Sequence, residues 1–211
     1  MSVVAMVLLI VAGVLGAAGG GAVLGAQKRR KELAGRGPKR LLSGRDDEVV
    51  ERTVSDVRVG DVVAHDSQDF VVEGTIHYDE DGHRWVGGRM CDGQHVRWLM
   101  VGVEGVGGER VRIYEEDSGA HEGGPPPEVI ATAGARYTLD RRGTANAKIH
   151  GNAGALIGRG GKAGMFKRCR FWRYEAAGGH GLVIEEWDGG AFRALRGRTI
   201  GPGDLDLIPG S

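Results

Sequence analysis

Residues 57–82 read VRVGDVVAHDSQDFVVEGTIHYDEDG, and their pattern indicates the fold class of the chain. Valines surround the dipeptide Gly60-Asp61, and a run rich in β-branched and aromatic residues extends from Phe70 to Tyr78. The four residues that follow, 79–82, have the composition of a turn. Short runs of this kind, broken by Gly and Asp, are typical of strands joined by hairpins. The stretch therefore predicts antiparallel β-structure.

The same composition continues towards the C-terminus, in residues 96–103 and 111–114. No window between residues 53 and 211 keeps a helical period of apolar residues over three turns. We therefore expect residues 53–211 to form an all-β soluble module, either a sandwich or a partly open barrel.

The module divides at residues 115–128, which are rich in Glu, Gly and Pro and are predicted to connect two halves, 53–115 and 129–211. Residues 70–73 (FVVE) resemble residues 137–140 (YTLD), and the second half carries a glycine-rich insert, 143–164. This weak similarity predicts two pseudo-repeated β-units. The alternative is that unrelated hairpins share the same residue types.

A membrane anchor is predicted at the N-terminus, residues 1–27. Residues 3–26 carry no charged side chain. As a helix they would span about 36 Å at about 1.5 Å per residue, against a hydrocarbon core of about 30 Å. A cleaved signal peptide is the alternative, but the basic segment that should precede its apolar run is missing.

The basic residues after this run predict its orientation. Lys28, Arg29, Arg30 and Lys31 should stay on the cytoplasmic side, so the expected location is the cell (inner) membrane, single-pass, with the N-terminus out and the C-terminal domain cytoplasmic. The same cluster is expected to contact anionic lipid, and residues 28–52 are interpreted as a basic linker. The spacing of Gly16 and Gly20 allows a homodimer through the helix.

Several short motifs resemble the bacterial domain-of-unknown-function family 4178. They are residues 59–63, 70–74, Trp85, 98–99 and 103–104 in the first half, and Gly134, Tyr137, 171–174, 184–185 and 204–209 in the second. The resemblance covers residues 54–209. It implies a β-rich module without catalytic residues to carry over, and an association with membrane-linked bacterial stress assemblies.

No complete catalytic or metal signature is present. His77, His83, Cys91 and His95 lie close in sequence, but their spacing matches no zinc motif. The stretch 151–164 is glycine-rich, but Lys162 is followed by Ala163 where a phosphate-binding loop needs Ser or Thr. We therefore assign no catalytic residue, no metal ligand and no cofactor.

The basic block 136–175 is the main charge feature, with ten Lys or Arg against two Asp or Glu. The possible interaction face is Lys167, Arg168, Arg170, Trp172 and Arg173. Three roles are open: neutralising the acidic first half, binding a membrane or an acidic protein, and stacking on single-stranded nucleic acid. Nucleic acid is the least favoured of the three.

The expected function is that of a membrane-tethered, non-enzymatic interaction module with an unidentified protein partner, in a membrane-stress assembly. The alternative is a hydrolase or ligand-binding enzyme with its site between the two β-units. Glu104 and Glu185 or Glu186 occupy matching places in the two halves, where a carboxylate pair could perform acid–base chemistry.

Overall fold

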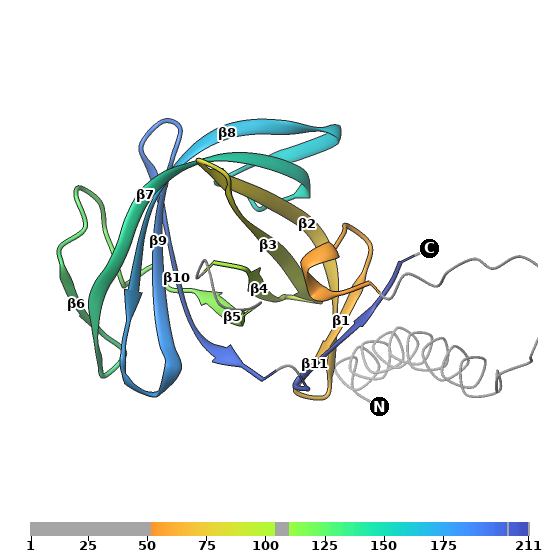
Figure 1. Ribbon diagram of the computed structural model, residues 1–211, viewed down its shortest axis with the longest axis horizontal. Helices are drawn as coiled ribbons and strands as arrows, with labels where there is room; N and C mark the ends of the chain where they lie inside the picture. Colours follow the sequence, from red (N-terminus) through yellow and green to blue (C-terminus); the bar gives the residue numbers. More distant parts are fainter. Residues whose placement is uncertain (1–51, 104–109, 202, 211) are drawn as a thin grey trace, which may run out of the picture. The chain divides into compact units, whose positions relative to one another are not determined.

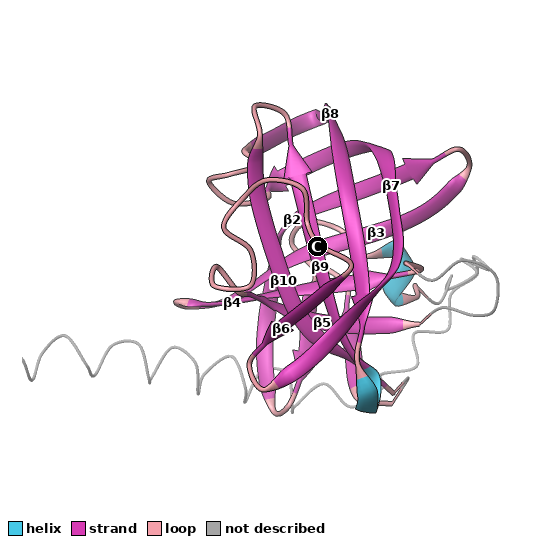
Figure 2. Ribbon diagram, turned by 90° about the vertical axis from the view of Figure 1, so that its left-hand side faces the viewer, coloured by secondary structure: helices cyan, strands magenta, loops and turns pink. Residues whose placement is uncertain are grey.

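The computed structural model describes residues 52–103, 110–201 and 203–210. These residues form eleven β-strands and two 3-10 turns, η1 (Val54–Asp56) and η2 (Ala177–Gly179), and contain no α-helix (Figure 2). The strands are β1 (Val62–His65), β2 (Gln68–Glu80), β3 (His83–Asp92), β4 (His95–Val101), β5 (Val111–Glu116), β6 (Val129–Thr132), β7 (Ala135–Asn152), β8 (Arg159–Glu175), β9 (His180–Trp187), β10 (Ala191–Ile200) and β11 (Leu205–Ile208). The all-β prediction is therefore confirmed.

The predicted anchor lies outside the described residues, as do Gly16, Gly20 and the cluster Lys28–Lys31. Within the described part of the chain, no helix has the length and apolar composition needed to cross a membrane. All described residues belong to one unit, Val50–Ser211.

The strands form one antiparallel sheet, most of which closes into a ring. Its order is β11-β1-β2-β3-β4-β5-β10-β9-β8-β7-β6, and β2 also pairs with β7. This additional pairing closes the eight strands from β2 to β7 into a ring, with the β1–β11 pair and β6 as extensions (Figure 1). One edge of β2 changes partner along its length: Gln68–Val71 pairs with β1, and Gly74–Asp79 pairs with β7.

Tight turns set the register of three hairpins. Asp66 and Ser67 between β1 and β2 both have positive φ, as do Asp81-Gly82 between β2 and β3 and Ala133-Gly134 between β6 and β7. Two-residue turns with positive φ at both positions match the right-handed twist of the flanking strands. The turn predicted at 79–82 is thus present, and it ends β2.

The two halves have the same strand order. Strands β1–β5 follow one another as neighbours, β6–β10 do the same, and the halves join through β2–β7, β5–β10 and β1–β11. Phe70 and Tyr137 occupy equivalent positions, because Phe70 pairs with Val63 of β1 and Tyr137 pairs with Ile130 of β6. Both side chains are buried.

The glycine-rich stretch 143–164, interpreted from the sequence as an insert in the second half, mostly forms the adjoining ends of β7 and β8. Glycine has low strand propensity, so composition alone conceals these strands. Here the missing side chain permits close approach: a Cβ on Gly160 would lie 1.9 Å from the carbonyl oxygen of Ile149.

Three hydrophobic clusters stabilise the sheet. The largest includes Ile76, Trp98 and Trp187, whose side chains point to the inside of the ring. The second lies where β1 and β11 cover the outer side of β2–β5, and the third where β6 covers the outer side of β7–β10. Both sides of much of the ring are therefore buried.

Asp61 fixes the segment that enters the sheet, residues 52–61, which we call the entry segment. Its buried carboxylate accepts hydrogen bonds from the Arg52 guanidinium at 2.7 Å, the Arg58 amide at 2.7 Å and the Gly210 amide at 2.8 Å. The backbone of Asp61 also accepts a hydrogen bond from the amide of Val72 at 2.8 Å. Asp61 thus joins both ends of the described unit to β2 through its side chain and its backbone together.

Candidate functional site

A buried ion pair lies inside the ring. Glu185 of β9 and Arg193 of β10 are opposite each other in the sheet register, and their side chains are 2% and 4% exposed. Glu185 also accepts hydrogen bonds from the Tyr78 hydroxyl at 2.8 Å and from Trp187 Nε1 at 3.0 Å. Because a buried charge is tolerated only when it is paired and hydrogen-bonded, this cluster is a strong constraint on the core.

Aromatic rings and a thiol complete this cluster. The Arg193 guanidinium lies 3.9 Å from the centroid of the Trp98 ring, within the range of a cation–π contact. Cys169 is fully buried in the same cluster, and burial, followed by the Glu185 carboxylate, raises the pKa of its thiol well above the usual value. Burial and Glu185 likewise raise the pKa of Tyr78.

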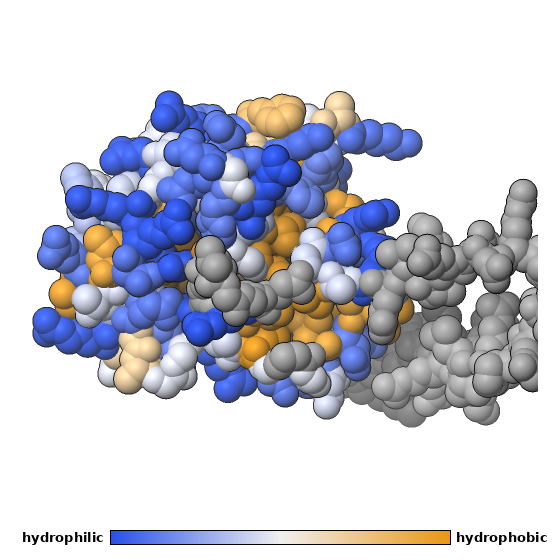
Figure 3. All heavy atoms as spheres, in the orientation of Figure 1, coloured by the Kyte–Doolittle hydropathy of each residue, from blue (hydrophilic) through white to orange (hydrophobic). Residues whose placement is uncertain are grey.

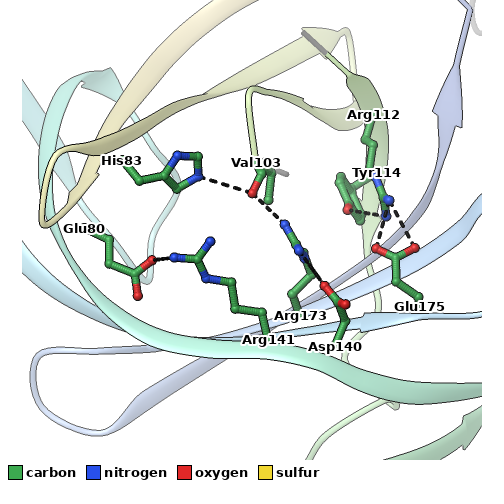
Figure 4. A network of polar contacts seen from close by, with 9 residues as sticks. All are labelled: Glu80, His83, Val103, Arg112, Tyr114, Asp140, Arg141, Arg173 and Glu175. Carbon is green, nitrogen blue, oxygen red and sulfur yellow. Dashed lines mark hydrogen bonds and ion pairs between the residues drawn. The ribbon is translucent and has the colours of Figure 1, made fainter. Parts of the chain in front are cut away.

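A second polar network lies at one end of the ring (Figure 4). Arg141 of β7 pairs with Glu80 of β2, and Arg112 of β5 contacts both carboxylate oxygens of Glu175 of β8, at 2.8 and 3.0 Å. Each of these pairs links strands that belong to different halves of the chain.

Arg173 of β8 lies at the centre of this network. It pairs with Asp140 of β7 and donates a hydrogen bond of 2.6 Å to the carbonyl oxygen of Val103. The imidazole of His83 lies 3.4 Å from the same oxygen. Each carboxylate in Figure 4 is bound by a guanidinium, so the network ties strands together rather than presenting an acid–base pair.

The predicted interaction residues do not form one exposed surface. Arg168 and Arg170 are exposed on the outer side of β8, and Lys167 is partly buried. Trp172 is 6% exposed, because β6 and its neighbours cover the outer side there, and Arg173 points into the ring. Strand alternation, which places adjacent residues on opposite faces, explains the split.

The ion pairs of the basic block, residues 136–175, show which acidic residues neutralise it. Among those formed between described residues, Arg141–Glu80 links the block to an acid of the first half. Arg173 and Arg170 pair instead with Asp140 and Glu186, acids of their own half. Internal neutralisation of the block by the first half is therefore partial, and the outer side of β8 keeps cationic side chains.

Comparison with known families places most of the described residues in one family. Residues 58–202 match the family described as Domain of unknown function (DUF4178). The chain belongs to this family. No curated protein and no solved structure matches the chain.

The matched residues of the DUF4178 chain run from the entry segment to just after β10, so they include every strand of the ring and both polar networks. The predicted resemblance to this family is thereby confirmed. The family description names no activity.

The other candidate residues lie apart. His77 is on the outer side of β2, whereas His83 stacks on Trp85 with centroids 5.3 Å apart. Cys91 contacts Arg89, and His95 is exposed. Among the described residues no group of three His, Cys, Asp or Glu side chains is placed to hold a metal. Glu104 lies outside the described residues, so its expected match with Glu185 or Glu186 stays a prediction.

The sequence did not identify Arg193, Tyr78 or His150 as important. Arg193 follows the strand alternation that places Leu195 in the core, so a period-2 pattern including one charged residue could have predicted a buried arginine. His150 lies in the stretch interpreted as an insert, where its pairing with Thr75 of β2 could not be predicted.

We expect the buried thiol to make the protein sensitive to alkali. The folded state holds the Cys169 proton to higher pH than the unfolded chain, whose thiols titrate near about pH 8.5. The protonated Cys169 thiol therefore stabilises the folded state fully below that pH. This stabilisation declines as the pH rises above it towards the raised pKa of the folded state, because the unfolded state then loses protons first. The free energy of unfolding, measured in urea between pH 7.5 and 10, should therefore fall.

Cys169→Ala should flatten this fall between pH 8.5 and 10, whatever its effect on stability at pH 7.5. Cys91→Ala is the matched control, because Cys91 is only partly buried and the pKa of its thiol is raised to a lesser degree. An unchanged pH slope in Cys169→Ala would contradict the assignment.

Proposed function

We propose that this chain is a non-enzymatic interaction module tethered to the inner face of the cell membrane, and that it docks on anionic lipid through the outer side of β7 and β8. We define the basic outer face as Arg142, Lys148, Phe166, Arg168 and Arg170. The tether would be residues 3–26, with Lys28–Lys31 against the lipid headgroups and the N-terminus outside.

The observation that supports this proposal is the exposure of the Phe166 ring beside arginines. Its side chain is 71% exposed, on a strand whose neighbouring outward positions hold Arg168 and Arg170. The Lys148 ammonium lies 5.6 Å from the centroid of the Phe166 ring. In Figure 3 hydrophobic atoms stand among hydrophilic ones at the upper edge, over β8.

An exposed aromatic ring surrounded by cations suits the interface of an anionic bilayer. The ring can enter the headgroup boundary, and each cation near the surface contributes about 1 kcal/mol. Arg170 pairs with Glu186 at 2.8 Å, but its side chain is 57% exposed and can still face lipid. A tether would hold the module at the membrane, where contacts of this strength suffice.

The enzyme alternative has less support from the geometry. The best candidate for a site between the two β-units is the network around Arg173, in which the carboxylates of Glu80, Asp140 and Glu175 are each bound by an arginine. A hydrolytic pair would need carboxylates placed to exchange protons with a substrate. These contacts instead link strands of the ring.

The test is vesicle binding of residues 50–211, which contain every described strand and hydrophobic cluster. A β-type circular dichroism spectrum and a cooperative melt would establish that this unit is folded. With vesicles containing phosphatidylglycerol, Arg168→Glu/Arg170→Glu should weaken binding at least about tenfold, since two attractions become repulsions. Phe166→Ser should weaken binding by about tenfold as well, because it removes an apolar ring.

The matched control is Arg136→Glu/Arg198→Glu, which changes the net charge equally at exposed positions on other parts of the sheet. Equal loss of binding in both double variants would contradict a localised face. Binding to an acidic polypeptide or to single-stranded nucleic acid, but not to vesicles, would overturn the membrane proposal.

A further inference from the structure

A cleft of about 740 Å³ lies outside the ring, between the entry segment and the outer sides of β2, β7 and β8. Pockets of about 300–1,000 Å³ are typical of small-molecule sites. None of the residues of the basic outer face lines it. Lys148 of that face lies opposite His77 in the sheet register, so the cleft adjoins the basic outer face without sharing a lining residue with it.

The wall formed by the entry segment is fixed from three sides. Val57 is buried in the second hydrophobic cluster, and Asp61 holds the Arg58 amide at 2.7 Å. Val59 lies against the backbone of Gly151, where a Cβ would come within 2.8 Å of Val59 Cγ2. The side chain of Arg58, between these two valines, therefore projects from a rigid support beside the cleft.

The opposite side of the cleft carries two histidines from the strands that close the ring. His77 of β2 and His150 of β7 have ring centroids 5.7 Å apart, in an edge-to-face arrangement. The hydroxyl of Thr75 is 3.4 Å from His77 Nε2. Gly164 of β8 leaves room for His150, because a Cβ there would lie 3.0 Å from His150 Cε1.

The cleft is cationic. Its charged or titratable lining residues are Arg58, His77, His150 and Lys162, with Asp56 as the acid. Lys148 adds positive charge opposite His77 in the sheet register. Burial, His150 and Lys148, in that order, lower the pKa of His77. A bound anion would offset the last two effects and favour the protonated form of His77.

We propose that this cleft binds the phosphate group of a small ligand, held by Arg58, His77, His150 and Lys162. A tetrahedral phosphate accepts hydrogen bonds from several directions, and here donors come from the entry segment, β2, β7 and β8. The glycines and valines of the lining leave room for an apolar or neutral body attached to the phosphate. The inference does not depend on membrane docking.

The ligand source is either a soluble phosphate ester or the headgroup of phosphatidic acid. Both present a terminal phosphate monoester, which is the chemistry that the four donors recognise. The proposal predicts that binding strengthens as the pH falls, since protonated histidines add charge-assisted hydrogen bonds. The groups that face His77 are Thr75 on its own strand, His150 and Lys148 on β7, Lys162 on β8, and Arg58 and Asp56 on the entry segment.

The experiment uses the full chain in a neutral detergent, with inorganic sulfate and inorganic phosphate as probes. Sulfate keeps its charge between pH 6 and 8, so its pH dependence reports the histidines. We expect sulfate to bind about tenfold more tightly at pH 6 than at pH 8 by calorimetry, and to shift the imidazole resonances of His77 and His150.

Arg58→Gln and His150→Gln should each weaken binding at pH 6 by about tenfold, because each removes a charge-assisted contact. The matched control is His180→Gln, at an exposed histidine away from the cleft, which should leave binding unchanged. A thermal melt of each variant establishes that it is folded. His77→Gln/His150→Gln should abolish the pH dependence.

Two further arms separate the ligand sources. Displacement of sulfate by glycerol 3-phosphate supports a soluble ester, and displacement only by vesicles containing phosphatidic acid supports a lipid headgroup. Phe166→Ser should leave sulfate binding unchanged, so a failure of membrane docking is distinguishable from a failure of this site. No shift of either histidine at millimolar sulfate and phosphate, or normal binding in both Arg58→Gln and His150→Gln, would overturn the proposal.

Discussion

Glu185→Gln should lower the free energy of unfolding by about 3–5 kcal/mol, the usual cost of leaving one partner of a buried ion pair without its counter-charge. The substitution keeps the size of the side chain but removes the charge that compensates Arg193 inside the ring. The Tyr78 hydroxyl and Trp187 Nε1 would also face a weaker acceptor. Urea unfolding followed by tryptophan fluorescence measures the loss.

Glu186→Gln is the control for this prediction. Glu186 is the next residue on β9, but it is only partly buried and pairs with the exposed Arg170. Surface pairs contribute about 0–1 kcal/mol, so this variant should be nearly as stable as the wild type. A loss in Glu185→Gln no larger than that in Glu186→Gln would show that the pair is not a constraint on the core.

Replacing both charges tests the same point differently. Glu185→Leu/Arg193→Met removes the need for compensation, so it should be more stable than Glu185→Gln alone. If the double variant is the less stable of the two, the orientation of the aromatic rings around Arg193 contributes more than the pair itself.

Gly151→Ala should open the place where β2 and β7 close the ring. Gly151 has φ +67°, and a Cβ there would lie 2.3 Å from the carbonyl oxygen of Glu73. The positive φ costs about 1–2 kcal/mol for alanine, and overpacking adds about 1–3 kcal/mol. Because the same Cβ would displace Val59, sulfate binding in the cleft should weaken as well. Chemical denaturation and calorimetry measure the two effects.

Gly93→Ala separates strain from collision. Gly93 lies in the turn between β3 and β4 with φ +58°, and nothing lies within 4 Å of the Cβ that alanine would add. It should therefore show only the conformational cost. Equal losses in Gly93→Ala and Gly151→Ala would mean that the close approach of β2 and β7 is not a constraint.

The fold class was predictable because hairpin turns and β-branched runs are local features. The run from Phe70 to Tyr78 lies within β2, and the turn that ends at Gly82 lies where its composition indicated. The closure of the ring was not predictable, since it depends on β2 changing its partner from β1 to β7 at a bulge between Val72 and Gly74. The local sequence does not indicate a pairing with a residue 75 positions away, such as that of Thr75 with His150.

The candidate sites were harder to predict from the sequence than the fold. Sequence reasoning grouped Trp172 and Arg173 with Arg168 and Arg170 because all are basic or aromatic, but burial depends on what covers each side of β8. The cleft could not be predicted, because Arg58 and His150 line the same space only where the entry segment packs against Gly151. Charge counts identified the basic block and left its faces undetermined.

The pairing of β1 with β11 has a mechanical consequence. Val62 pairs with Ile208 and His65 with Leu205, so the first residue of β1 and the last residue of β11 lie side by side. A force that pulls residues 52 and 210 apart would break the Asp61 contacts and then unzip the hydrogen bonds of β1 and β11 one after another. The closure of the ring lies outside this path, because it depends on β2–β7 and β5–β10. The two short strands would thus yield under tension while the ring stays intact.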